Sequence, residues 1–164
     1  MQRKTFYAWA IAAFGGWILG DHTWVTTYKP VERLPPDPHD GEYWYCWGDG
    51  HCTPPADPDS RFLARQEGDL EFAVRVACPN EDAEDCGLEY GKQGVCHQMA
   101  NRILYATAID DRPPLKVENA RGYYLTVALY GEYGGKGSRG DQSRRRWEEV
   151  VKDWVSRRGE GKSP

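Results

Sequence analysis

Cys96 is the side chain in this sequence whose surroundings best suit a nucleophile. It stands in the sequence GVCHQ at residues 94–98, where a glycine turn leads into a predicted helix at residues 94–108. A thiol at the start of a helix faces unpaired amide hydrogens and the positive end of the helix dipole, which stabilise the thiolate and lower the thiol pKa. The position therefore predicts a reactive cysteine, which still needs a base.

The other four of the five cysteines fall into two local pairs, Cys46 with Cys52 and Cys78 with Cys86. Each pair encloses a short loop-like stretch, so we expect two small disulfide rings if the protein works in an oxidising compartment. These cysteines and His51 are also types that bind zinc, but the spacings within the pairs are wider than in structural zinc sites. We favour disulfides over a metal site and expect no cofactor.

A cysteine nucleophile needs a histidine within hydrogen-bond reach, held in place by a third polar group. His22 is the best candidate among four histidines, because it follows a glycine and opens a predicted strand at residues 22–28. His39 lies in a proline-rich loop. His97 is a poor base for Cys96, because consecutive helix positions point about 100° apart.

The third polar group follows from the expected strand pairing. If the strand that begins at His22 pairs antiparallel with a second predicted strand at residues 42–47, the start of the first lies beside the end of the second. Asp49 and His51 then come near the imidazole, and we favour His51 narrowly. Asp21 is an alternative if the backbone turns sharply beside it.

Strand-like and helix-like segments must position these side chains. Runs rich in β-branched and aromatic residues predict strands, and apolar residues at helical spacing predict helices. Proline-rich and glycine-rich loops separate the segments, and no internal repeat is visible. The predicted strands cover residues 22–28, 42–47, 70–78 and 123–130, and the predicted helices cover residues 94–108 and 143–157, the latter amphipathic and docked by its Trp face.

The apolar run at residues 5–19 has two readings. It follows a basic start and contains the small-residue pattern Ala10-Ile11-Ala12, so it resembles a secretory signal. Fifteen residues are too few to span a membrane, which takes about 20. We favour a buried first element, helix or strand, and expect no stable membrane insertion.

Length and charge narrow the class of protein. The 164 residues fit one domain, which we take as residues 1–164. The formal charge of −4 disfavours nucleic acid as a partner, although Arg144, Arg145 and Arg146 form a basic cluster.

The order of the two motifs resembles a known family. DHTWV at residues 21–25 opens a strand, and GVCHQ at residues 94–98 opens a helix. The pattern is similar to that of papain-like NlpC-type cysteine peptidases in circularly permuted form, in which the histidine precedes the cysteine. The resemblance covers about residues 20–130. It implies an α+β papain-like fold with an antiparallel sheet and a packed nucleophile helix, with Cys96 as nucleophile and His22 as base.

The resemblance also implies a reaction and a setting. The thiolate attacks an amide carbonyl, the backbone amide of Cys96 holds the oxyanion with Gln98 as a further donor, and water hydrolyses the thioester. The implied substrate is a peptide bond of the peptidoglycan stem. The nearest likeness is to antibacterial effectors of type VI secretion, made in the bacterial cytoplasm and secreted or delivered to the target-cell periplasm, with an immunity protein or secretion-apparatus component as possible partner.

Two other functions fit the same residues. The permuted branch of the family includes thioester-forming acyltransferases and lipid hydrolases. A different class is a disulfide-stapled, aromatic-rich binding or inhibitory module in which Cys96 is part of the core, because cysteine is among the most often buried residues.

Overall fold

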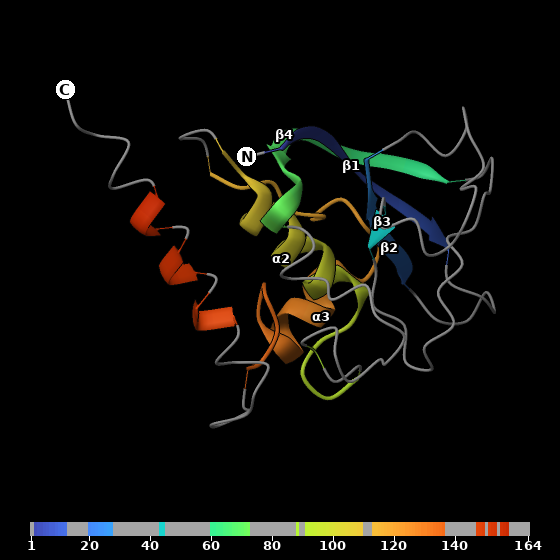
Figure 1. Ribbon diagram of the computed structural model, residues 1–164. Helices are drawn as coiled ribbons and strands as arrows, with labels where there is room; N and C mark the ends of the chain where they lie inside the picture. Colours follow the sequence, from blue (N-terminus) through green and yellow to red (C-terminus); the bar gives the residue numbers. More distant parts are fainter. Residues whose placement is uncertain are drawn as a thin grey trace.

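An antiparallel sheet of four strands forms one layer of the protein, and two helices lie on one side of it (Figure 1). The strand order is β3-β2-β1-β4. This arrangement confirms the α+β class, while the papain-like topology stays a prediction. The computed structural model describes residues 2–12, 20–27, 43–44, 60–72, 88, 91–109, 113–136, 147–149, 151–153 and 155–157.

β1 (Arg3–Ala12) is a central strand that is buried on the helix side and partly buried on the other face. Side chains alternate along a strand, and Phe6, Ala8 and Ala10 are fully buried on the helix side, where the two alanines leave room for a packed helix. Trp9 is buried on the other face and donates its indole N–H to the Thr26 hydroxyl at 2.9 Å. The expected buried first element is thus a strand.

β2 (Asp21–Thr26) is buried at every residue and pairs antiparallel with β1. Thr23 and Val25 stand opposite Ala10 and Ala8, so they share the face that packs on the helices. His22 and Trp24 point to the opposite face, where their rings stack with centroids 5.8 Å apart. Consecutive side chains of β2 therefore lie on opposite faces of the sheet.

The predicted antiparallel pairing of residues 22–28 with residues 42–47 is confirmed only at residues 43–44, where the second segment is described. β3 (Tyr43–Trp44) pairs with β2 at Val25 and Thr26. Residues 42 and 45–47 of the second segment lie outside the described residues.

β4 (Arg61–Asp69) is an edge strand that the sequence did not indicate. It pairs antiparallel with β1, with a register shift beside Ala8. Residues 70–72 are helical, so the predicted strand at residues 70–78 is wrong at its start, and residues 73–78 lie outside the described residues. Strand patterns are weak at polar, exposed edges, because such strands carry charges that discourage pairing with other chains.

α2 (Cys96–Thr107) is the central helix and confirms the helix predicted at residues 94–108. Its apolar residues share one hydrophobic core with Phe6 and Ala8 of β1, and the helix lies against β2. Its buried polar residues bind the chain that follows. Asn101, for example, accepts the Val117 N–H at 3.0 Å and donates to the Glu132 carbonyl at 2.7 Å.

α3 (Tyr123–Tyr130) packs against α2, and the strand predicted at residues 123–130 is wrong. Aromatic and β-branched residues favour strands in isolation, but tertiary packing overrides such preferences. The segment is apolar on nearly every side, so its sequence carries no helical period, and the less exposed side chains are Tyr123, Thr126, Val127 and Tyr130.

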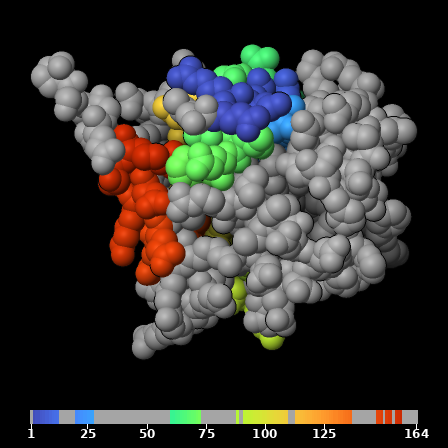
Figure 2. Space-filling model, in the orientation of Figure 1, coloured from blue at the N-terminus to red at the C-terminus, as the bar shows by residue number. Residues whose placement is uncertain are grey.

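The amphipathic helix predicted at residues 143–157 is helical at residues 147–149, 151–153 and 155–157. Trp147 is half-buried and stacks on Tyr133 with ring centroids 5.1 Å apart. Figure 2 shows these helical residues beside the segment that ends β4, where Arg157 lies over the Phe72 ring at 3.3 Å. Of the predicted apolar face, Trp147 makes this contact, Val155 is 57% exposed, and Trp154 lies outside the described residues.

Candidate active site

The two segments that open β2 and α2 meet at one backbone atom, the carbonyl oxygen of Asp21. The sulfur of Cys96 lies 3.8 Å from this oxygen, and Nε2 of His97 lies 2.9 Å from it. Cys96 and His97 are the first two residues of α2, so both side chains leave the helix where its amide hydrogens are unpaired. Residues 75 positions apart in the chain thus form one junction.

Burial controls the charge of the Cys96 thiol. The residue is only 4% exposed and forms no disulfide. Burial raises the thiol pKa, and backbone N–H groups and the Thr23 hydroxyl oppose this by bonding to the thiolate. The Thr23 hydroxyl has no other hydrogen-bond partner of standard geometry among the described residues. In this structure burial dominates, so the thiol is protonated at neutral pH.

His97 does not point away from Cys96, contrary to the expectation from helix geometry. Both side chains turn to the Asp21 carbonyl, because the first turn of the helix abuts the start of β2. The other ring nitrogen, Nδ1, lies 3.0 Å from the Thr126 hydroxyl on α3. Burial lowers the pKa of His97, while the hydrogen bond to the Asp21 carbonyl and the Asp21 charge oppose that shift.

His22 lies one residue beyond the junction, on the opposite face of the sheet from Cys96. Burial, and then the charge of His97, lower the pKa of His22 to about 4. The two imidazoles therefore interact electrostatically, and His22 is uncharged at neutral pH. The structure brings His22 into the same neighbourhood as the thiol but not onto the same face.

The carboxylate of Asp21 does not orient His22. Its side chain is 2% exposed and forms a salt bridge with Arg61 at 2.6 Å. It also accepts the backbone N–H of Arg121 at 2.8 Å and has the guanidinium of the same residue 3.8 Å away. Asp21 anchors the start of β2 to the segment before α3.

Gln98 joins helices. Its Oε1 accepts the Val95 N–H at 3.1 Å, and its Nε2 donates to Thr126 and to the Gly131 carbonyl, both at 3.1 Å. These two bonds use both hydrogens of the Gln98 side-chain amide, so it is not free to donate to an oxyanion, contrary to the expectation from the sequence.

Two threonines of the site were missed by the sequence reasoning. Thr23 contacts the sulfur, and Thr126 contacts the ring of His97. Thr23 follows His22 directly, so the alternation of a strand could have indicated that it faces the helix. No local sequence pattern marks Thr126 as a site residue.

Several predicted site residues lie outside the described residues. They include the favoured third residue His51 and its alternative Asp49. The two cysteine pairs lie there as well, so the expected disulfides and the zinc alternative stay predictions: Cys46, Cys52, Cys78 and Cys86.

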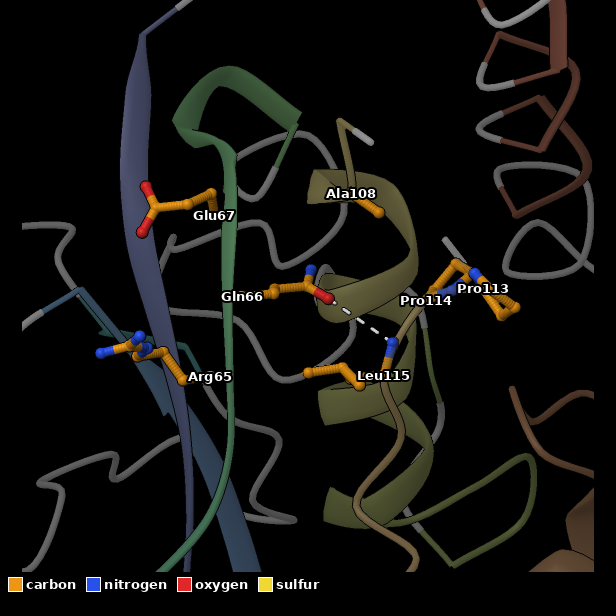
Figure 3. A pocket seen from close by; sticks show the side chains of 7 residues that line it. All are labelled: Arg65, Gln66, Glu67, Ala108, Pro113, Pro114 and Leu115. Carbon is orange, nitrogen blue, oxygen red and sulfur yellow. Dashed lines mark hydrogen bonds between the residues drawn. The ribbon is translucent and has the colours of Figure 1, made fainter. Parts of the chain in front are cut away.

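A cavity of about 400 Å³ lies beside β4, away from the thiol (Figure 3). Figure 3 shows the Gln66 side chain directed across it to the Leu115 backbone, at 3.5 Å. The lining residues come from β4, the end of α2 and the segment after it: Arg65, Gln66, Glu67, Ala108, Pro113, Pro114 and Leu115. Neither Cys96 nor either imidazole takes part, so this cavity is separate from the candidate site.

No helix within the described residues has the length and apolar character needed to cross a membrane. Comparison of the chain with protein-family models, with curated proteins and with solved structures finds no match.

Proposed function

We propose that the protein is a cysteine-dependent amidohydrolase in which Cys96 is the nucleophile and His22 the base. The observation that carries the proposal is the contact between the two motifs, with the Cys96 sulfur 3.8 Å from the Asp21 carbonyl oxygen. A helix that begins with a thiol against the start of a histidine-bearing strand is the arrangement that the sequence resemblance implies.

The local chemistry supports a thiolate once substrate is present. Backbone N–H groups of Thr23, Cys96 and His97 bond to the ionised sulfur and lower the pKa that burial raises. Two imidazoles with lowered pKa values lie nearby, and an uncharged imidazole can accept a proton at neutral pH. The site therefore holds a potential nucleophile together with potential bases.

Catalysis requires the start of β2 to move. The thiol is 4% exposed, and His22 leaves β2 on the face away from it. We propose that substrate entry displaces Asp21 and His22 so that the ring and the sulfur face one reaction centre. His51 would then orient the ring through its other nitrogen.

The reaction proceeds by acyl transfer. His22 takes the proton of Cys96, and a bond forms between sulfur and the amide carbonyl carbon. The bond from this carbon to nitrogen breaks, and His22 returns the proton to the leaving amine. Water then adds to the thioester carbon and releases a carboxylic acid and the thiol. The amide hydrogen of Cys96 would stabilise the negative oxygen of each tetrahedral intermediate.

The proposed substrate is a peptide bond in the peptidoglycan stem, and the proposed setting is an antibacterial effector delivered to the periplasm. Both follow from the resemblance of residues 21–25 and 94–98. An acyltransferase or lipid hydrolase would use the same thioester chemistry, and would differ in the acyl group that Cys96 accepts.

One observation favours a second candidate, a binding or inhibitory module without catalysis. A thiol with its pKa raised by burial is typical of an inert core cysteine. On the surface, α3 exposes large apolar side chains that suit a protein interface: Tyr124, Leu125 and Leu129 are 71%, 64% and 57% exposed.

Digestion of purified peptidoglycan, followed by mass analysis of the soluble fragments, tests the proposal. We expect new amine and carboxyl ends at one type of stem-peptide bond. Wild type and the Cys96→Ser variant are compared after both show the same far-UV circular dichroism. If the peptidoglycan stays uncut and Cys96 instead accepts an acyl group from a lipid ester probe, the protein is an acyltransferase or lipid hydrolase and not an amidohydrolase. No product from either substrate would favour the binding module.

A further inference from the structure

The hydroxyl group of Thr126 lies among three polar groups that connect α2 with α3. Its oxygen is 3.0 Å from Nδ1 of His97 and 3.1 Å from Nε2 of Gln98, which donates to it. It is also 2.8 Å from the carbonyl oxygen of Tyr123. The single hydroxyl hydrogen therefore has two possible acceptors, the imidazole nitrogen and the carbonyl.

The partner of the other ring nitrogen decides which acceptor is used. The Asp21 carbonyl oxygen can only accept, and it is 2.9 Å from Nε2 of His97, so Nε2 must carry a hydrogen. In the neutral ring Nδ1 then has a free lone pair, and the Thr126 hydroxyl must donate to it. The hydroxyl oxygen still accepts from Gln98.

We propose that Thr126 is a positioning residue of the Cys96 site. Its hydroxyl group fixes the His97 ring in the tautomer that binds the Asp21 carbonyl, and its oxygen can accept a hydrogen bond from the same ring when the ring is protonated. The proposal rests on the proposed function insofar as Cys96 is the reactive thiol, and nothing in the sequence motifs pointed to a residue on α3.

The protonated ring is satisfied without any movement of heavy atoms. Nδ1 then donates to the Thr126 oxygen, and the hydroxyl hydrogen rotates to the Tyr123 carbonyl at 2.8 Å. Thr126 thus supports both protonation states of His97, whereas an apolar side chain in its place would support neither.

Other charged or titratable groups also surround the ring. Asp21 and His22 approach from β2, Cys96 is the neighbour on α2, and the Tyr123 ring on α3 is 6.1 Å away between centroids. The Asp21 carboxylate favours a charged His97. Since these groups are retained when Thr126 is changed, a shift in the pH profile of such a variant reports the loss of the hydroxyl.

Two threonine substitutions isolate this hydroxyl. Thr126→Val keeps the shape and removes the hydroxyl, while Thr126→Ser keeps the hydroxyl and removes a methyl group. We expect the pKa of the His97 ring, followed by NMR, to fall by about one unit in Thr126→Val, because the lost hydroxyl accepts from the charged ring and hydrogen bonds to a charged group are the stronger ones. Thr126→Ser should retain the wild-type pKa of the ring.

Nitrogen NMR of the wild-type His97 ring supplies a second readout that needs no variant. We expect hydrogen on Nε2 and none on Nδ1 at high pH. Hydrogen on Nδ1 instead, or equal pKa values of the His97 ring in wild type and a folded Thr126→Val, would overturn the proposal. Should the expected tautomer and shift be found while no amide substrate is cleaved, the proposed function fails and the role of Thr126 stands.

Discussion

Nε2 of His97 lies 2.9 Å from the carbonyl oxygen of Asp21, and this hydrogen bond joins the first turn of α2 to the first residue of β2. The Cys96 sulfur approaches the same oxygen. Cys96 and His97 therefore both contact the Asp21 carbonyl oxygen, although the sequence suggested that His97 takes no part in the site. The junction fixes where the thiol lies relative to the sheet.

Cys96 should react slowly with iodoacetamide at neutral pH, and faster as the pH rises. Burial raises the thiol pKa, so the ionised fraction at pH 7 is smaller than that of an exposed cysteine. Peptide mapping by mass spectrometry distinguishes Cys96 from the other cysteines. The urea-unfolded protein is the control. Equal rates in folded and unfolded protein at pH 7 would contradict the buried, protonated thiol.

His22→Phe should make the protein less sensitive to mild acid. The folded pKa of His22 is lowered from 6.5 to about 4, so the unfolded chain binds more protons between these values and stability falls as the pH drops through that window. From pH 7 to pH 5 this loss is about 2 kcal/mol for wild type. Phe keeps the ring stacked on Trp24 and cannot be protonated.

Urea unfolding at the two pH values measures this effect. Between pH 7 and pH 5 the free energy of unfolding should fall by about 2 kcal/mol less in His22→Phe than in wild type. An identical pH dependence in both proteins would show that His22 titrates normally and is not buried as the structure has it.

Asp21→Asn should destabilise the start of β2 by about 1–2 kcal/mol. The substitution removes the charge that binds Arg61 at 2.6 Å and Arg121, while the half-exposed Arg61 can still be solvated. Glu118→Gln, which removes a carboxylate at an exposed position, is the matched control. Equal urea midpoints for the two variants would argue against the buried salt bridge.

Gly68→Ala should cost about 1–3 kcal/mol, because an added methyl group overpacks the core. A Cβ atom at Gly68 would lie 2.7 Å from the Phe6 ring and 2.8 Å from Cβ of Thr107. Gly20→Ala is the control, since its nearest neighbour is the Arg121 carbonyl oxygen at 3.8 Å. Thermal unfolding of both variants tests how closely β4 packs on the end of α2, and equal melting temperatures would contradict that packing.

The sequence predicted elements well where burial and periodicity coincide. The helix of Cys96 and the strand of His22 were found because both carry strong local patterns. β4 was missed because its polar residues suit an exposed edge. The residue types at 123–130 predict a strand, but the segment is a helix that packs against α2, and its nearly uniform apolar sequence shows no helical period.

Of the candidate site, the sequence indicated Cys96 and His22 but not the residues that surround them. Cys96 and His22 stand out by residue type and position, but a single sequence does not reveal which face of β2 meets the helix. That choice depends on pairing with β1, where Ala8 and Ala10 make room for α2. It places Thr23 rather than His22 against the sulfur, and it brings His97 and Thr126 into the site from directions that no local pattern marks.

Turnover of peptidoglycan stem peptides by wild type and by Cys96→Ala, compared at equal concentrations of folded protein, tests the central claim most directly. The account predicts release of a defined stem-peptide fragment by wild type and a loss on the order of 10³-fold or more in the variant, because removal of a nucleophile abolishes the covalent path. Release of the same fragment by Cys96→Ala at the wild-type rate would contradict the assignment of Cys96 as nucleophile.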